Sequence, residues 1–173
     1  MHLSDVLMIL AVLFSPFLAV FAQRKIDLAR ERSGQKLWIF RTLMATRGKR
    51  LALEHVQALN SIELFFSNPR KDKNIIEKWN EYLDHFNQAP KDDDKDYPIK
   101  INSWLEKGDD LLADLLQVMG ESLGYDFDKV KIKRGIYMPR GHGEEMNDQL
   151  IIRKGFVKIL EGKASFPVEV KNT

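Results

Sequence analysis

The residues best placed to do chemistry lie in the segment Tyr-Met-Pro-Arg-Gly-His-Gly-Glu-Glu, which begins at Tyr137. Arg140 and His142 alternate there with glycines just before a predicted helix, where exposed amides favour anions. Tyr137, Arg140 and His142 are therefore candidate binding residues for a small molecule or nucleotide. Against this, Glu144 and Glu145 already complement the helix dipole and would repel an anion. The segment also lacks a Walker-type motif, and we favour an ordinary ordered loop.

No other residues form a convincing reactive group. Glu81 and His85 stand four apart, so both could face one metal ion, but no second pair completes such a site. His55 follows Glu54 at a predicted helix start, where we expect the pair to cap the helix and face solvent. The chain has no cysteine, which excludes disulfides, thiolate metal sites and a cysteine nucleophile. Serine-nucleophile and H-E-x-x-H signatures are absent, so we predict no enzyme, no catalytic or metal-binding residue and no cofactor.

The first element along the chain is an apolar run at residues 6–22, which carries no charge and ends at Gln23-Arg24-Lys25. A helix needs roughly 17–25 apolar residues to cross the hydrocarbon core, so we predict a transmembrane anchor at residues 1–23. No Lys or Arg precedes the run, which predicts an N-terminus outside the cell. A cleaved signal peptide is the alternative, although it would need a positive n-region. A buried core helix is excluded because the run has no polar face.

Charge is strongly segregated behind this run. Residues 23–50 carry a net charge of +7, residues 51–128 a net charge of −9, and residues 129–173 a net charge of +5. We predict a basic juxtamembrane helix at residues 24–50, with Arg24, Lys25, Arg30 and Arg32 against anionic headgroups of the bilayer. The expected location is the cell inner membrane, spanned once, with the C-terminal domain in the cytoplasm.

The remaining residues, 51–173, are predicted to form a cytosolic, mainly α domain. Apolar periodicity and end signals indicate helices over residues 51–67, 72–89, 99–123 and 144–161. Asp72 is the predicted N-cap of the second helix, Gly108-Asp109 a break within the third, and Gly124 and Gly162 two helix ends. The clearest apolar stripe consists of Ile75, Ile76, Trp79, Leu83 and Phe86.

One or two short strands are expected near the C-terminus. Residues 129–137 alternate lysines with Val130 and Ile132, and a period of two is typical of a strand. Residues 165–170 are predicted to be extended, either paired with that strand or as a tail. The lysines have no interleaved aromatic residue before Tyr137, so nucleic acid is not an expected partner.

Residues 44–60, Met-Ala-Thr-Arg-Gly-Lys-Arg-Leu-Ala-Leu-Glu-His-Val-Gln-Ala-Leu-Asn, together with the apolar run and Tyr137-x-Pro, resemble an uncharacterised bacterial family. Its members are short, once-spanning, largely helical proteins classed as a domain of unknown function. The resemblance implies no activity, cofactor or catalytic residue, but it draws attention to residues 45–47 and 55–60. One departure is that Ala52-Leu53 stands where the family prefers a capping Ser-Pro.

These features predict a membrane-anchored helical interaction module that binds another protein or a second copy of itself, in a stress, prophage or defence setting. One alternative is a small-molecule or nucleotide-binding effector that uses residues 140–145. Another is a membrane-disrupting effector that oligomerises through residues 6–22. Neither alternative is excluded by the sequence.

Overall fold

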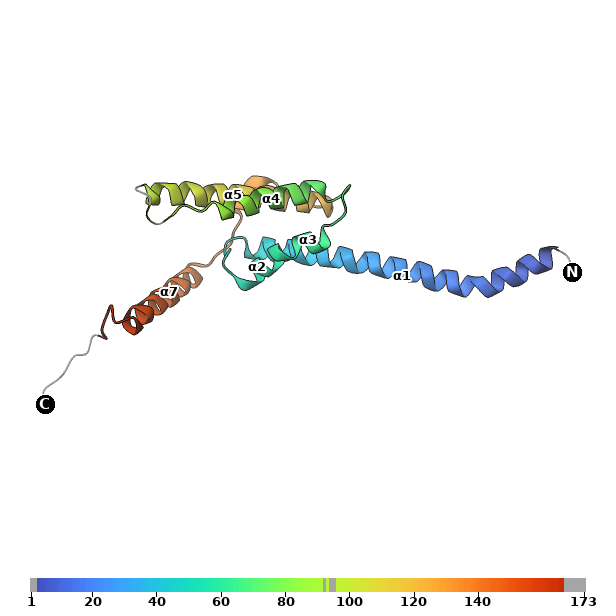
Figure 1. Ribbon diagram of the computed structural model, residues 1–173, viewed down its shortest axis with the longest axis horizontal. Helices are drawn as coiled ribbons and strands as arrows, with labels where there is room; N and C mark the ends of the chain where they lie inside the picture. The colour runs from blue at the N-terminus through green and yellow to red at the C-terminus, as the bar shows by residue number, and fades with distance from the viewer. Residues whose placement is uncertain (1–2, 92, 94–95, 167–173) are drawn as a thin grey trace, which may run out of the picture. The chain divides into compact units, whose positions relative to one another are not determined.

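The protein is mainly helical in the residues that its computed structural model describes, which are 3–91, 93 and 96–166 (Figure 1). The chain divides into two compact units, residues 1–135 and residues 136–173. The prediction of a mainly α protein is confirmed. The helices are α1 (Leu3–Thr46), α2 (Leu53–Asn60), α3 (Ile62–Phe65), α4 (Lys73–Asn87), α5 (Tyr97–Ser122), α6 (Lys129–Arg134) and α7 (Arg140–Leu160).

Helix α1 is one continuous helix of 44 residues, so the predicted anchor and the predicted basic helix belong to a single element. The prediction of a transmembrane anchor at residues 1–23 was wrong. Among the described residues, no helix combines the length and the apolar character that a membrane crossing requires. The apolar residues instead begin a helix whose other end is built into a folded unit.

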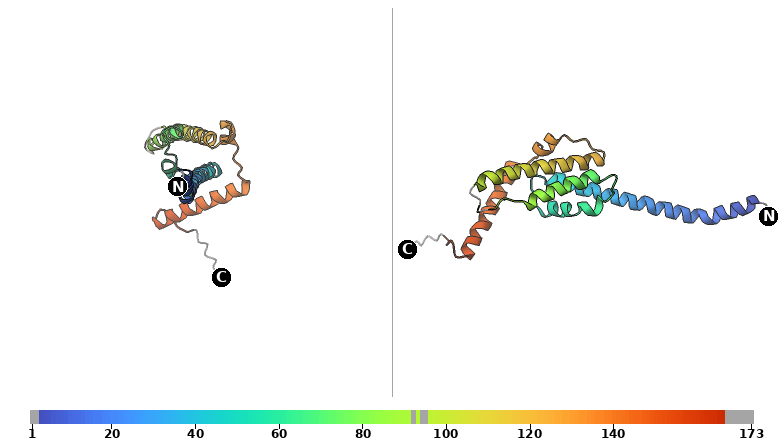
Figure 2. Two further views of the ribbon diagram at one scale, coloured as in Figure 1. Left: turned by 90° about the vertical axis from the view of Figure 1, so that its right-hand side faces the viewer. Right: turned by 45° about the horizontal axis from the view of Figure 1, so that its top comes forward.

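The core of the first unit forms around the last turns of α1. Ile39 and Leu43 stand four apart and are wholly buried, as expected for one face of a helix. This part of α1 contacts α2, α3 and α5, and α4 packs along α5 (Figure 2). The buried apolar residues are Ile39, Phe40, Leu43, Ala58, Ile62, Phe66, Ile75, Trp79, Tyr82, Leu111, Leu112, Ala113, Leu115, Leu116, Met119 and Ile132.

The predicted helix over residues 51–67 is divided at Ser61 into α2 and α3. Ala52 occupies the N-cap position of α2 without a side-chain hydrogen bond, because alanine has no side-chain acceptor. Ile62 and Phe66 are buried, whereas Val56 is exposed. Ala58 and His55 face the core instead.

Helix α4 confirms the predicted position and most of the predicted stripe. Ile75 and Trp79 are buried, whereas Leu83 is partly exposed and Tyr82 takes the buried position beside it. Helix α5 runs without the predicted break, and Gly108 lies buried inside it. A Cβ atom there would lie 3.0 Å from Arg50 Nη1 and 3.2 Å from Phe86 Cζ, so the missing side chain allows α5 to approach both groups.

The end of α5 confirms the predicted role of Gly124. Its φ of +83° lies in the left-handed region that glycine adopts readily. The Tyr125 amide donates to the Gly120 carbonyl at 2.8 Å and the Gly124 amide to the Glu121 carbonyl at 3.1 Å. These two bonds form a Schellman motif, which satisfies carbonyls at the helix end.

The predicted strand at residues 129–137 was wrong, because residues 129–134 form helix α6. Asp128 caps this helix, its carboxylate accepting a hydrogen bond from the Val130 amide at 2.6 Å. Lys129 forms an ion pair with Asp114 and Lys133 with Asp110. The two lysines are four residues apart, and so are the two aspartates on α5. Residues four apart lie on the same side of a helix, so the helical form of residues 129–134 lets both lysines reach their aspartates. Within the described residues, the fold contains no strand.

Replacing Asp128 by alanine is expected to destabilise the protein by about 1 kcal/mol, because the Val130 amide loses its capping acceptor. Urea unfolding of the full chain measures this cost. Asp126→Ala provides the control, since Asp126 is an exposed aspartate in the preceding loop. Equal stability of the two variants would contradict the capping role.

The second unit contains α7, which begins at Arg140 and not at the predicted residue 144. Pro139 precedes it, and proline is compatible with a helix start because it lacks an amide donor. Gly162, with a φ of +71°, ends the helix as predicted. Of the predicted extended segment, Ser165 and Phe166 are described and have no regular structure, whereas residues 167–170 lie outside the described residues.

Candidate functional site

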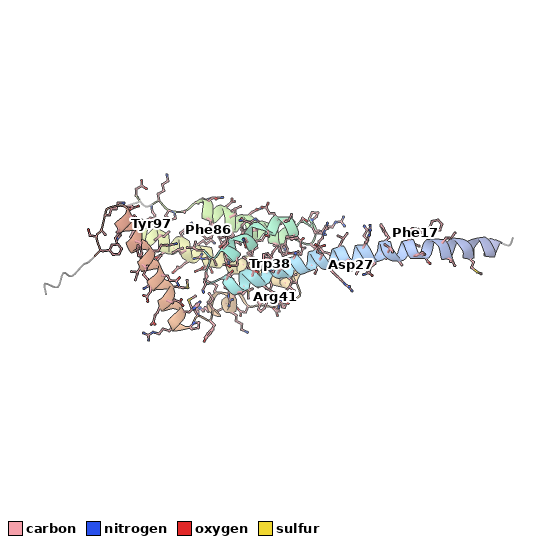
Figure 3. All side chains as sticks on the ribbon, turned by 90° about the horizontal axis from the view of Figure 1, so that it is seen from below. Phe17, Asp27, Trp38, Arg41, Phe86 and Tyr97 are labelled. Atoms are coloured by element: carbon pink, nitrogen blue, oxygen red, sulfur yellow. The ribbon has the colours of Figure 1, made fainter. Side chains whose placement is uncertain are left out.

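The first half of α1 exposes a continuous apolar surface, and Figure 3 shows Phe17 on the part of the helix that no other element surrounds. We call residues 12–21 the apolar segment. Its large side chains are 58–73% exposed, although each is of a type usually found inside proteins. They are Val12, Leu13, Phe14, Phe17, Leu18, Val20 and Phe21.

The sequence places these side chains around most of the helix. At 100° per residue they cover roughly two thirds of the circumference, and Ser15, Ala19 and Ala22 occupy the remaining third. The small residues form a shallow stripe along which a second helix can approach closely. Exposed apolar surfaces of this extent mark interaction sites in soluble proteins, so the apolar segment is the candidate functional site.

Pro16 lies inside this part of α1 without ending it. A proline has no amide hydrogen, so the carbonyl of Val12 loses its usual donor four residues on. The Ser15 hydroxyl donates to that carbonyl at 3.4 Å. This bond compensates in part for the missing one, and the helix continues through the apolar segment.

The four predicted membrane-surface residues, Arg24, Lys25, Arg30 and Arg32, all lie on α1 immediately after the apolar segment and are exposed. Lys25 and Arg32 stand seven residues apart and share one side of the helix, whereas Arg24 and Arg30 point to other sides, since 100° separates consecutive residues. Their predicted contact with lipid headgroups was derived from the membrane span. In the structure they form a basic segment between the apolar segment and the folded part of the first unit, and their contact with lipid headgroups stays a prediction.

The predicted ligand-binding residues lie at the start of the second unit. Tyr137 is 90% exposed, and Arg140 and His142 belong to the first turn of α7 rather than to a loop. The Arg140 Nε donates to the Glu144 carboxylate at 2.7 Å, and His142 Nδ1 lies 4.0 Å from Glu145. The two acidic residues thus engage the groups that would bind an anion. Binding by these residues stays a prediction.

A buried polar cluster that we did not predict joins the end of α1 to α2. His55 is wholly buried, so the expectation that it faces solvent was wrong. The Thr46 hydroxyl donates to the Thr42 carbonyl at 2.7 Å and therefore accepts from His55 Nδ1, which lies 2.8 Å away. His55 is thereby held as the tautomer with its proton on Nδ1. Burial, reinforced by the charge of Arg50, lowers the pKa of His55 to about 4.

A second buried polar contact joins α1 to the residue before α4. Asp72 is only 1% exposed, and both its carboxylate oxygens accept from Lys36 Nζ, at 2.7 and 2.6 Å. One of these oxygens also accepts from the Asn68 amide at 2.9 Å. Asp72 precedes α4 as predicted, but its side chain does not cap that helix. The predicted position of Asp72 before α4 is therefore correct, but the predicted hydrogen bond from its side chain to α4 was wrong.

Glu81 and His85, which were considered as metal ligands in the sequence, both lie on α4. Within the part of the chain that the structure describes, no group of three or more potential ligands could hold a metal ion. The His85 ring bonds the Trp104 carbonyl at 2.8 Å, and the Trp104 indole donates to the His85 carbonyl at 3.0 Å. His85 thus connects α4 to α5.

Comparison with known proteins identifies the family but no activity. Residues 1–173 match the family described as "Family of unknown function (DUF6680)". The chain therefore belongs to this family, which confirms the resemblance to an uncharacterised domain. No curated protein and no solved structure matches the chain.

Proposed function

We propose that this DUF6680 chain is a helical interaction module that associates with a second copy of itself through the apolar segment of α1. The observation that carries the proposal is the exposure of seven large apolar side chains on a helix that continues into a folded unit. Water contact with this much apolar surface is unfavourable, by about 25 cal/mol per Å². A complex in which a partner covers the segment would therefore be strongly stabilised.

The area supports a stable interface. An aromatic side chain has roughly 150–250 Å² to bury, so Phe14, Phe17 and Phe21 together expose on the order of 400 Å². The aliphatic residues between them add a similar area. The total approaches the roughly 800 Å² per partner of a stable protein interface, and covering all of it requires association between pairs as well as the pair itself.

The occupant that we infer is another α1, because the segment needs a long apolar helix and the chain itself supplies one. Charge favours an antiparallel pair over a parallel one. In a parallel pair, Arg24 and Lys25 of the two copies would lie side by side. In an antiparallel pair that overlaps residues 6–22, they are separated by about 30 Å, well beyond the roughly 10 Å screening length.

The assembly expected from this pairing has two-fold symmetry, with the same surface on both copies. The stripe of Ser15, Ala19 and Ala22 allows the closest approach of the two helices. The bulkier sides of the apolar segment remain available for association between pairs. The particle mass should therefore be two times, or a larger even multiple of, the 20.1 kDa chain mass.

Charged substitutions in the apolar segment test this proposal. The double variant Val12→Glu, Leu18→Glu is expected to weaken self-association at least 30-fold, because these two residues flank the small-residue stripe and their carboxylates would lose water at the interface. Sedimentation equilibrium over a range of chain concentrations measures the association constant. Glutamate is a good helix former, so circular dichroism should show unchanged helicity.

The matched control is Leu53→Glu, Leu64→Glu, which adds the same charge at leucines 67% and 71% exposed in α2 and α3. This control should associate like the unmodified chain. A monomeric unmodified chain, or equal weakening in both variants, would overturn the proposal. A chain that stays monomeric and instead binds lipid vesicles or an unrelated protein through residues 12–21 would also overturn it.

A further inference from the structure

A groove in the first unit lies between α1 and the turn that follows α3. Its volume is about 430 Å³, within the range of sites that bind small molecules. On the side opposite α1 it is lined by Phe65, Ser67, Asn68 and Asp72, and the carboxylate of Asp72 is bonded to Lys36. The lining residues on α1 are Lys25, Leu28, Ala29, Arg32, Ser33 and Lys36.

The cationic residues in this lining share one face of α1. At 100° per residue, Lys25, Arg32 and Lys36 fall within roughly 40° of one another. Asp27 and Glu31, the acidic residues of the same stretch, lie roughly 100° or more away from this stripe. The helix thus presents a positive face to the groove and directs its negative charges elsewhere.

Two of the three cations are available to a ligand. The ammonium of Lys36 is bonded to both oxygens of Asp72 and lies 4.9 Å from the Phe66 ring centroid. Lys25 Nζ lies 5.5 Å from the centroid of the exposed Phe21 ring, and among the described residues neither Lys25 nor Arg32 forms an ion pair. Ala29 and Ser33 lie beside them, and these small side chains leave the groove open between the two cations.

We infer that this groove binds a small oligophosphate, with Lys25 and Arg32 as its cationic ligands and the Ser67 and Asn68 side chains as further hydrogen-bonding groups. Guanidinium and ammonium groups are the usual partners of phosphate oxygens. Lys25 and Arg32 are about 10 Å apart along the helix axis. A ligand with several linked phosphates therefore engages both cations, whereas a single phosphate engages one.

Calorimetric titration of the full chain with inorganic tripolyphosphate tests the inference. We expect sub-millimolar binding, and binding of inorganic phosphate at least tenfold weaker. The double variant Lys25→Gln, Arg32→Gln should weaken tripolyphosphate binding at least tenfold. The control Arg24→Gln, Arg30→Gln removes the same charge from other sides of α1 and should alter the affinity less than twofold. All four residues are exposed, so thermal unfolding should show both variants folded.

Three results would overturn the inference. The first is the absence of any heat of binding when the tripolyphosphate concentration reaches about 10 mM. The second is equal weakening in the two double variants, which would indicate diffuse attraction of anions to a basic helix. The third is binding to vesicles of phosphatidylglycerol without binding to tripolyphosphate, which would identify a lipid headgroup as the source of the phosphate chemistry.

Discussion

Replacing Lys36 by methionine is expected to lower the free energy of unfolding by about 3 kcal/mol. Lys36 provides the cation that lies 2.6 and 2.7 Å from the two oxygens of Asp72, whose side chain is 1% exposed. Without it, Asp72 becomes an uncompensated buried charge. Removing one partner of a buried ion pair costs about 3–5 kcal/mol, and the partial exposure of Lys36 favours the lower value.

A double-mutant cycle separates the charge effect from the loss of packing. Asp72→Asn keeps an oxygen that can accept from the Asn68 amide, a bond of 2.9 Å in the structure. Lys36→Met combined with Asp72→Asn should therefore be more stable than Lys36→Met alone. Unfolding in urea, followed by the fluorescence of the three tryptophans, measures all three variants.

The control is Lys78→Met, which breaks the exposed pair of Lys78 with Glu81 at 2.7 Å. Exposed pairs contribute about 0–1 kcal/mol, so this variant should be nearly as stable as the unmodified chain. If Lys36→Met costs no more than Lys78→Met, the Lys36–Asp72 pair is not a buried structural contact.

Acid is expected to destabilise the protein through His55 by about 3 kcal/mol. Its pKa is about 4 in the folded chain, against 6.5 in the unfolded chain. Between these values the unfolded state binds the proton and the folded state does not. The stability contributed by neutral His55 is therefore complete above pH 6.5 and is lost as the pH falls toward 4, at about 1.4 kcal/mol per unit of pKa difference.

The variant His55→Gln cannot titrate in this range and isolates the effect. Unfolding free energies at pH 7 and pH 4.5 should differ by much less in His55→Gln than in the unmodified chain. His142→Gln, which removes a half-exposed histidine, should retain the full acid sensitivity. An identical pH dependence in His55→Gln and the unmodified chain would show that His55 is not held neutral by burial.

Sequence periodicity predicted most helices because their apolar faces recur every three or four residues. Ile75 and Trp79 of α4 show this pattern clearly and are buried. The short helix α6 escaped detection because Lys129 to Arg134 also fits the alternation of a strand. Its helical state depends on the Asp128 cap and on Asp110 and Asp114, two aspartates that lie on a different element.

The buried polar contacts could not be predicted because their partners are distant in the sequence. Lys36 and Asp72 are 36 residues apart, and no local pattern indicates their pairing. The family resemblance did draw attention to residues 45–47 and 55–60, which include Thr46 and His55. Their hydrogen bond at 2.8 Å gives that stretch a structural role in joining α1 to α2.

The transmembrane prediction failed for a related reason. It rested on the number of apolar residues at 6–22, whereas no helix among the described residues is both long enough and apolar enough to cross a membrane, and α1 continues to Thr46 and enters the core at Ile39. An apolar helix that projects from a folded unit needs a partner in either case. The sequence alone offered lipid as that partner, and the structure directs attention to helix pairing.

Disulfide trapping between copies tests self-association through α1 most directly, because the chain has no native cysteine. Ser15 lies next to the midpoint of residues 6–22 and in the small-residue stripe, so an antiparallel pair brings the two Ser15 positions within disulfide range, about 4.4–6.8 Å between Cα atoms. Ser15→Cys should therefore form a covalent dimer rapidly under mild oxidation, whereas Gln23→Cys, at opposite ends of the pair, should not. Absence of a Ser15→Cys dimer, or equally rapid dimer formation by Gln23→Cys, would contradict the antiparallel pairing of α1.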